Sequence, residues 1–150
     1  MSNDENAYGP SSWEWVADQV RDYEASGGAE ANTLMDTGLP IIVVTTMGHK
    51  SGLIRKVPLM QVEHEGEYAI IASKAGMPHH PGWYHNLVAD PNVAIQDGAE
   101  AKPFTVREVE GEERAEWYAR GVAAYPPYAE YQVSATEFGR TIPVFVASPI

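Results

Sequence analysis

Two pairs of predicted strands, each separated by a tight-turn dipeptide, constrain the fold of this chain most strongly. The pairs are residues 54–63 with 67–73, around Glu65-Gly66, and residues 92–97 with 99–108, around Asp97-Gly98. Asp-Gly is typical of the type I′ turn that joins the two strands of a hairpin. Strands joined by such short turns run antiparallel, and we therefore predict a mainly antiparallel sheet.

Further elements complete an α+β pattern. We predict a buried strand over 40–46, a short helix over 81–89 with Pro81 in its first turn, a helix over 112–122 and a final strand over 141–147. A small closed or split β-barrel with flanking helices fits this order of elements. The length of 150 residues predicts one domain, over 11–150, behind a disordered lead over 1–10.

An amphipathic helix is predicted near the N-terminus. Ser11 and Glu14 have the spacing of a capping box, and the helix should end near Gly27-Gly28. Its apolar face is formed by Trp13, Val16, Ala17 and Val20. This face could pack on the core, close over a ligand or touch a membrane, although the acidic polar face disfavours anionic lipid.

The charge balance excludes several classes of partner. The chain has 21 acidic and 10 basic residues, a formal net charge of -11, and no cysteine. Its long-range field repels phosphate backbones, which argues against nonspecific binding to nucleic acid or to an anionic membrane. The lack of cysteine excludes thiol catalysis, thiolate-bound zinc and disulfides. No apolar leader or span of ~20 apolar residues is present, so we expect a cytoplasmic protein.

A cluster of cations stands out against this acidic background. Lys50, Arg55 and Lys56 lie beside Gly48 and Gly52, immediately after the buried strand. The glycines let the backbone approach a ligand, while the lysines and arginine can bind phosphate or carboxylate groups, with further hydrogen bonds from His49 and Ser51. The bland alternative is a solvated hairpin tip. The spacing does not match a phosphate-binding P-loop, because Pro58 follows and no helix does.

A second candidate segment runs from residue 73 to residue 87. Ser73 and Lys74 lie where a strand leaves the sheet, a common place for ligand contacts. Trp83 offers a flat face and Asn86 a paired donor and acceptor, although Trp83 could equally anchor the short helix to the barrel. The nearby histidines have no acidic residue between them, and we predict no metal site.

Three tyrosines form the third candidate group. Tyr125, Tyr128 and Tyr131 recur every third residue, which places them on one broad face if they share a helix. Such a face is an apolar wall with hydrogen-bonding tips, suited to a flat substrate that carries oxygen atoms. A plain core-packing stripe is the alternative.

Taken in order, these segments resemble the deazaflavin-dependent nitroreductase family, whose coenzyme is F420. The resemblance covers residues 35–149 and is carried by the following motifs: Thr46-Met-Gly-His-Lys-Ser-Gly with Arg55 and Pro58-Leu59, Ala72-Ser-Lys-Ala-Gly, Pro81-Gly-Trp-Tyr-His-Asn-Leu with Asp90-Pro91, Tyr125-Pro-Pro-Tyr-Ala-Glu-Tyr-Gln, and Arg140-Thr-Ile-Pro-Val. Two positions depart from the family pattern, with His49 where arginine is usual and Ala75 where a second glycine is usual.

The resemblance implies a split β-barrel of the FMN-binding and pyridoxamine-phosphate-oxidase type. It implies that His49, Lys50, Arg55 and Lys74 meet the coenzyme's phosphodiester and polyglutamate tail. The full set expected to bind the coenzyme is His49, Lys50, Ser51, Arg55, Lys56, Pro58, Ser73, Lys74, Ala75, Gly76, Trp83 and Asn86. The expected catalytic set is Tyr125, Tyr128, Tyr131 and Ser73, which line the acceptor pocket or donate a proton.

The expected reaction is hydride transfer from reduced F420 to a quinone of the menaquinone type, a nitroaromatic or nitroimidazole compound, or an enone. The partners are then a small-molecule acceptor, a second copy in a homodimer, and the inner face of the membrane as a peripheral contact. Two alternatives stay open. One is an FMN-dependent oxidoreductase of the same fold, although FMN's single phosphate needs fewer cations, and the other is a noncatalytic coenzyme-binding or interaction protein.

Overall fold

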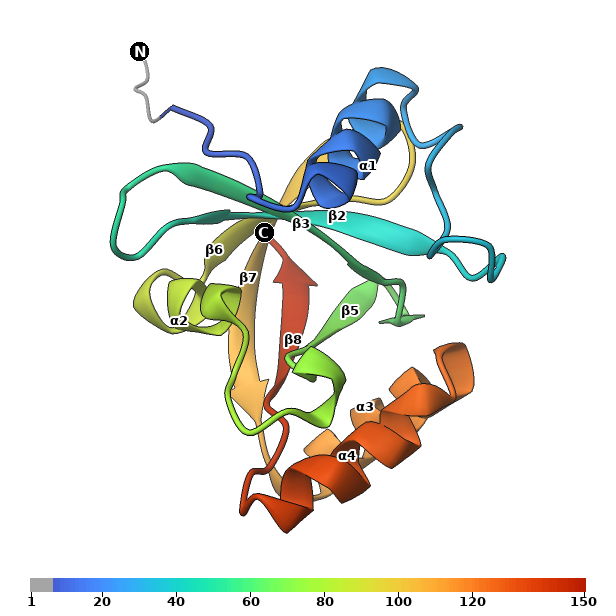
Figure 1. Cartoon of the computed structure of the whole chain (residues 1–150), viewed down its shortest axis with the longest axis vertical. Helices are drawn as coiled ribbons and strands as arrows, with labels where there is room; N and C mark the ends of the chain where they lie inside the picture. The colour runs from blue at the N-terminus through green and yellow to red at the C-terminus, as the bar shows by residue number, and fades with distance from the viewer. Residues whose placement is uncertain (1–6) are drawn as a thin grey trace.

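The computed structural model describes residues 7–150. The strands are β2 (Ile41–Met47), β3 (Ile54–Met60), β4 (Glu63–His64), β5 (Glu67–Ile71), β6 (Asn92–Gln96), β7 (Ala101–Val109) and β8 (Val144–Pro149). The helices are α1 (Glu14–Ala25), the 3-10 turn η1 (Lys74–Gly76), α2 (Gly82–Ala89), α3 (Gly111–Ala124) and α4 (Pro127–Glu137). Helix α1 lies across one end of the molecule, while α3 and α4 pair at the opposite end (Figure 1).

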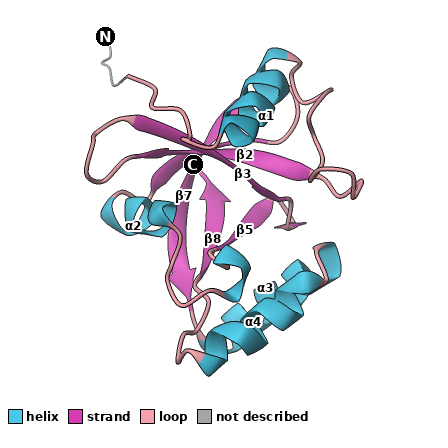
Figure 2. Cartoon of the chain, in the orientation of Figure 1, coloured by secondary structure: helices cyan, strands magenta, loops and turns pink. Residues whose placement is uncertain are grey.

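All seven strands form one antiparallel sheet in the order β3-β2-β6-β7-β8-β5-β4. Strands β3 and β4 stand at opposite ends of this order, although only residues 61–62 connect them. The sheet must therefore curl until its two ends meet, which makes it the predicted split barrel (Figure 2). Asp97 ties the structure across this seam, because it accepts hydrogen bonds from Gln61 at 2.9 Å and from the Tyr68 hydroxyl at 2.7 Å.

The first four residues of β2, over 41–44, are all apolar because both faces of the sheet are buried there. Ile41 and Val43 pack into one core cluster, with α1, α3 and α4. Ile42 and Val44 point the other way, into a second cluster that contains Leu87 of α2. Side chains of a strand alternate between its faces, so four apolar residues in succession fit a stretch of strand that is covered on both faces.

The first predicted hairpin, which paired residues 54–63 with 67–73, was wrong about the partner of β3. Strand β3 pairs with β2 along its whole length, from Ile41 opposite Met60 to Met47 opposite Ile54. Only the two residues of β4 fold back on β5 around Glu65-Gly66, and the rest of β5 pairs with β8. Turn chemistry identified the reversal correctly, but it carries no information on which distant strand supplies the remaining hydrogen bonds.

The second hairpin is confirmed as a pair but not as a type I′ turn. Strands β6 and β7 pair from Gln96 opposite Ala101, so a four-residue connection over 97–100 joins them, with Gly98 at φ 107°. The side chain of Tyr23 occupies this turn, because its hydroxyl accepts a hydrogen bond from Gly98 N at 2.8 Å and donates to Gln96 O. The final strand begins at Val144 rather than at residue 141, and Pro81 caps α2 from outside its first turn.

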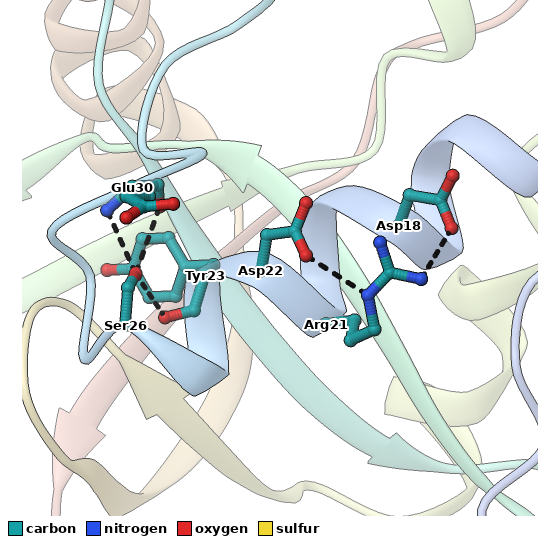
Figure 3. A network of polar contacts seen from close by, with 6 residues as sticks. All are labelled: Asp18, Arg21, Asp22, Tyr23, Ser26 and Glu30. Carbon is teal, nitrogen blue, oxygen red and sulfur yellow. Dashed lines mark hydrogen bonds and ion pairs between the residues drawn. The ribbon is translucent and has the colours of Figure 1, made fainter.

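The N-terminal segment differs from the predicted capping box. Helix α1 begins at Glu14 with Trp13 as its N-cap, and the Ser11 hydroxyl accepts a bond from Trp13 N instead. Val20 and Tyr23 are the buried residues of α1, whereas Trp13 stays 64% exposed. The polar side of α1 is tied by Arg21 to Asp18 and Asp22, and Ser26 closes the C-terminal turn against Glu30 (Figure 3).

Residues 7–10 of the predicted disordered lead are ordered. Residues 1–6 of that lead lie outside the described residues. The remainder runs beside β3, since Gly9 N donates to Ile54 O and Ile54 N donates to Ala7 O, both at 2.8 Å. An edge strand offers unpaired backbone groups, and here the N-terminal segment covers them.

Candidate functional site

Two cavities meet along the outer side of β3. One has a volume of about 830 Å³ and a mainly apolar lining, and the other has a volume of about 370 Å³. Five residues line both of them, namely Ser11, Val16, Val57, Gly82 and Trp83. The two cavities therefore form one cleft, in which we call the larger part the apolar chamber and the smaller part the cationic arm.

The cationic arm is built on the β2–β3 turn. Gly48 N donates to Leu53 O at 2.7 Å, Gly52 adopts φ 70°, and the turn thereby carries His49, Lys50 and Ser51 to the cavity wall. The positive φ at Gly52 is a conformation that a side chain would disfavour, as the sequence suggested for this loop. Arg55 and Lys56 of β3 line the same arm.

Not all of the predicted cations are free to bind a ligand. Arg55 Nη1 donates to Gly9 O at 2.9 Å, so part of its guanidinium holds the N-terminal segment. Lys56 Nζ lies 2.5 Å from Glu24 Oε2 of α1. Lys50 is exposed and has no ion-pair partner among the described residues, which makes it the cation of the arm most available to an anion.

Asn86 supports the cationic arm through hydrogen bonds to His49 and Thr46. Its side chain is buried, and its Oδ1 atom accepts hydrogen bonds from His49 N at 2.9 Å and from the His49 ring at 2.8 Å. Its Nδ2 atom donates to Thr46 Oγ1. The predicted ligand-binding amide is thus mostly occupied in holding the β2–β3 turn in place, and the His49 ring carries its proton on Nδ1 to make this contact.

The wall opposite β3 comes from the segment between β5 and α2. Lys74, Ala75 and Gly76 adopt positive φ values of 44°, 53° and 72°. Gly76 abuts α4, where a Cβ atom at this position would lie 2.9 Å from Tyr131 Cα, and Ser134 Oγ donates to Gly76 O at 3.1 Å. Consecutive left-handed residues without glycine are strained, and such strain persists only where tertiary contacts impose it.

Arg140 makes the contacts that hold the strained backbone of residues 74–76 in place. This buried guanidinium donates to the carbonyl oxygens of Ala72, Ser73 and Met77, and its Nε atom donates to His80 Nδ1 at 2.8 Å. Burial lowers the pKa of His80, and the charges of Arg140 and His85 lower it further, so its ring stays neutral and can accept this bond. Sequence reasoning assigned no role to Arg140, because nothing local distinguishes it from a surface arginine.

The strain at Ala75 leads to a testable result. Replacing Ala75 with Gly should raise the free energy of unfolding by about 0.5–1 kcal/mol. Glycine adopts φ 53° without the steric penalty, and this gain exceeds the loss that comes from the greater conformational freedom of glycine in the unfolded chain. Urea denaturation measures this change. Ala69→Gly in strand β5 is the control and should destabilise, and a destabilised Ala75→Gly variant would contradict the assigned strain.

The three predicted tyrosines all line the apolar chamber. They do not share one helix, since Tyr125 ends α3 while Tyr128 and Tyr131 belong to α4. The Tyr125 and Tyr131 hydroxyls are 3.2 Å apart, and the bond to Tyr125, together with burial, raises the pKa of Tyr131 to about 12. Burial also raises the pKa of Tyr128. The group therefore presents neutral phenols, which can donate a hydrogen bond or a proton.

The cleft brings together almost all of the predicted residues. Those in the cationic arm are His49, Lys50, Ser51, Arg55, Lys56, Trp83 and Asn86, and those in the apolar chamber are Pro58, Ser73, Lys74, Ala75, Trp83, Tyr125, Tyr128 and Tyr131. Gly76 lines neither and instead supports the wall. Helix α1 adds Trp13, Trp15 and Gln19 to the chamber, a contribution for which the amphipathic pattern had left three interpretations open.

Two further expectations concern metals and membranes. No group of three or more histidine and acidic residues is placed to hold a metal ion within residues 7–150. Within the same range, none of the helices has the length and apolar character needed to cross a bilayer.

The protein is an antiparallel split barrel whose cleft joins a cationic arm to an aromatic chamber, an arrangement suited to an anionic ligand that carries a flat ring system. Comparison with known proteins gives the family. The family model of the F420H(2)-dependent quinone reductases matches residues 15–149, and the chain belongs to this family. It is therefore an oxidoreductase whose reductant is the deazaflavin F420H(2), in agreement with the resemblance noted in its motifs.

Individual relatives agree with this assignment. Rv3178 of Mycobacterium tuberculosis, named as a member of the F420H(2)-dependent quinone reductases, is 32% identical over 111 residues, which cover 74% of this chain and 91% of the relative. The solved F420-H2 dependent reductase FDR-A is 54% identical with a TM-score of 0.67, over 73% of this chain and 94% of that one. A structure described as a domain-swapped dimer is 47% identical with a TM-score of 0.69, over 92% and 100% of the two chains.

Proposed function

We propose that this protein reduces a quinone of the menaquinone type with F420H(2), and that nitroaromatic, nitroimidazole and enone compounds are further acceptors. The observation that carries the proposal is the continuity of the cationic arm with the apolar chamber at Val57 and Trp83. An anionic tail and a flat ring system are thereby accommodated in one cleft. The same chamber has the volume to hold an aromatic acceptor beside the ring.

The lining of the cleft fits the coenzyme chemically. Four of the 10 basic residues of the chain line it, which are Lys50, Arg55, Lys56 and Lys74. None of the acidic residues that the structure describes does so, although the chain has 21 in total. Such segregation in a protein of net charge -11 focuses a positive potential on the cleft.

The chain's own residues divide the work between binding and proton supply. Bound F420H(2) supplies a hydride to the electron-poor acceptor. Lys50 and Lys74 bind the anionic part of the coenzyme, Trp83 shields the junction, and the chamber excludes water around the reacting rings. Tyr131 or Ser73 donates a hydrogen bond to the acceptor oxygen, and Tyr131 is held in place for this by Tyr125.

Coenzyme titration tests the proposal directly. Oxidised F420 should quench the tryptophan fluorescence of the protein in a salt-sensitive manner, because Trp83 lines the cleft and cations surround it. FMN should bind more weakly. Lys50→Gln should weaken F420 binding by about three- to tenfold, whereas Lys102→Gln, on exposed strand β7, should leave it unchanged. Preference for FMN would move the protein to the flavin branch, and binding of neither coenzyme would overturn the proposal.

The tyrosine role is tested by separating turnover from coenzyme affinity. Tyr131→Phe should lower turnover by roughly a hundredfold, the lower end of the range for losing one general acid, and should leave F420 affinity unchanged. Because the pKa of Tyr131 is raised to about 12, the phenol stays protonated and wild-type turnover should show no loss from its ionisation below pH ~10. Unchanged turnover of the variant with several acceptors would remove Tyr131 from the mechanism.

A homodimer is the second element of the proposal. The structure that is 47% identical and described as a domain-swapped dimer supports it. Light scattering coupled to size-exclusion chromatography should then give twice the 16.4 kDa chain mass, and a monomer at micromolar concentration would contradict the dimer without affecting the proposed reaction.

A further inference from the structure

A third cavity, of about 500 Å³, has no role in the proposed reaction. It is lined by His79, His80, His85, Phe138, Arg140 and Thr141, among others, and we call it the histidine pocket. Three of the five histidines of the chain thus face one space. A fourth, His49, stands in the cationic arm. No acidic residue within the described range lines the histidine pocket.

A row of rings connects the histidine pocket with the cationic arm. The His85 ring, exposed on α2, lies 5.5 Å from the ring of His49, measured between centroids. On its other side, Tyr84 lies 5.2 Å from His85 and 4.3 Å from His80. A ligand that follows the arm beyond His49 therefore meets His85 next and then the histidine pocket.

The charge of this pocket is positive and is not neutralised by the protein. Arg140 lines one side of it, and the partners of its guanidinium are three carbonyl oxygens and the neutral ring of His80 rather than a carboxylate. The titratable groups around His85 are His49 from the β2–β3 turn, Tyr84 from α2, and His79 and His80 from the preceding loop. None of these groups carries negative charge at neutral pH. One carboxylate lies beside the row, because Glu108 accepts a bond from the Tyr84 hydroxyl at 3.5 Å, but it does not line the pocket.

We propose that the histidine pocket binds the carboxylates of a flexible acidic chain that leaves the cationic arm past His49 and His85, and that it does so more tightly in mildly acidic than in mildly alkaline solution. When that chain is the tail of the coenzyme, this inference rests on the proposed function. The pocket would then make the protein bind coenzyme with a long acidic tail more tightly than coenzyme with a short one. The positive wall of Arg140 supplies a constant attraction, and the exposed imidazoles add a variable one.

The pH dependence follows from the chemistry of imidazole. Exposed histidines gain a proton as the pH falls through about 6.5, and each then attracts a carboxylate. An exposed ion pair changes affinity only by a factor of about two to five, because water and salt screen it. Two such contacts predict that a long acidic tail gains about fivefold in affinity between pH 7.8 and pH 5.8.

The test compares F420 carrying a single glutamate with F420 carrying a long polyglutamate tail, by tryptophan fluorescence at pH 5.8 and 7.8. The expected ratio of the two dissociation constants, short tail over long tail, is about ten at pH 5.8 and about two at pH 7.8. His85→Phe keeps a ring of similar shape beside His49 and should roughly halve the ratio at pH 5.8, because one of the two imidazole contacts is lost, while the short-tailed affinity stays the same. His79 also lines the pocket but makes no ring contact with another aromatic residue in the described part of the chain, so His79→Gln should halve the ratio without disturbing His49. His64→Gln, on distant strand β4, should change nothing.

The outcomes separate this inference from the proposed function. If both forms of F420 bind but the ratio stays at one, or does not respond to pH and to His85→Phe, the histidine pocket is not a tail site and the coenzyme assignment stands. If neither form binds, the coenzyme assignment fails, and calorimetry with free γ-linked oligoglutamate then tests the pocket alone. Binding of that peptide that is weakened by His85→Phe supports the pocket, whereas no binding, or binding that His85→Phe leaves unchanged, overturns it.

Discussion

Replacing Gly76 with Ala should destabilise the protein by about 3–5 kcal/mol and collapse the wall of the apolar chamber. Two costs add at this position. The backbone has φ 72°, which a Cβ atom disfavours by about 1–2 kcal/mol. The new methyl group would also lie 2.9 Å from Tyr131 Cα and closer still to the Tyr131 carbonyl oxygen, so helix α4 would have to move.

Gly66→Ala is the matched control. Gly66 has φ 85°, but a Cβ atom built there meets no heavy atom within 4 Å. This variant should lose only the conformational part, about 1 kcal/mol, in the same urea titration. Equal losses for the two variants would show that the contact of Gly76 with α4 is not tight. Because Tyr131 moves with α4, Gly76→Ala should also weaken acceptor binding, which Gly66→Ala should not.

Replacing Arg140 with Met should cost about 3–4 kcal/mol of unfolding free energy. The methionine fills the volume but leaves the carbonyl oxygens of Ala72, Ser73 and Met77 without the donor that now satisfies them. Each buried acceptor without a partner costs about 1–3 kcal/mol, less where water can reach it. Lys is expected to restore only part of the loss, because one ammonium cannot reach three carbonyls in the directions that the planar guanidinium does.

The affinity for F420 distinguishes Arg140 from an ordinary core residue. Release of the segment over 72–77 should raise the dissociation constant for F420 by about tenfold, since Ser73 and Lys74 would no longer be held at the cleft. Arg107→Met is the control, because Arg107 pairs with Glu113 on the exposed surface, and it should unfold at the same urea concentration as the wild type. An Arg140→Met variant that is destabilised but binds F420 normally would limit Arg140 to a structural role.

Much of the fold could be predicted from sequence because the relevant interactions are local. Alternation and apolar runs located β2, β6, β7 and the helices α2 and α3, and the motif resemblance indicated the split barrel. The partner of β3 was assigned wrongly although its true pairing with β2 is local, across the six residues 48–53, because the Glu65-Gly66 turn was taken to join β3 to β5. The pairing of β5 with β8 joins residues more than seventy positions apart, which local patterns do not encode.

The site was predictable as chemistry and less so as geometry. Charge clustering against an acidic background identified Lys50, and aromatic spacing identified the chamber tyrosines. The same reasoning could not show that Arg55 and Lys56 are partly engaged by Gly9 O and Glu24. These partners come from a segment some thirty to forty-six positions away, and their arrival depends on where α1 packs.

The sequence by itself determined which residue types are available to the cleft, the hairpin reversals and the coenzyme class, because propensity, charge and motif are properties of neighbouring residues. Only the tertiary structure decided which cations remain free, that Asn86 holds the β2–β3 turn, and that Arg140 maintains the strained wall at Lys74 and Ala75. The physical reason is that hydrogen-bond satisfaction and burial are decided between segments distant in the chain, where each buried group takes the partner that packing brings to it.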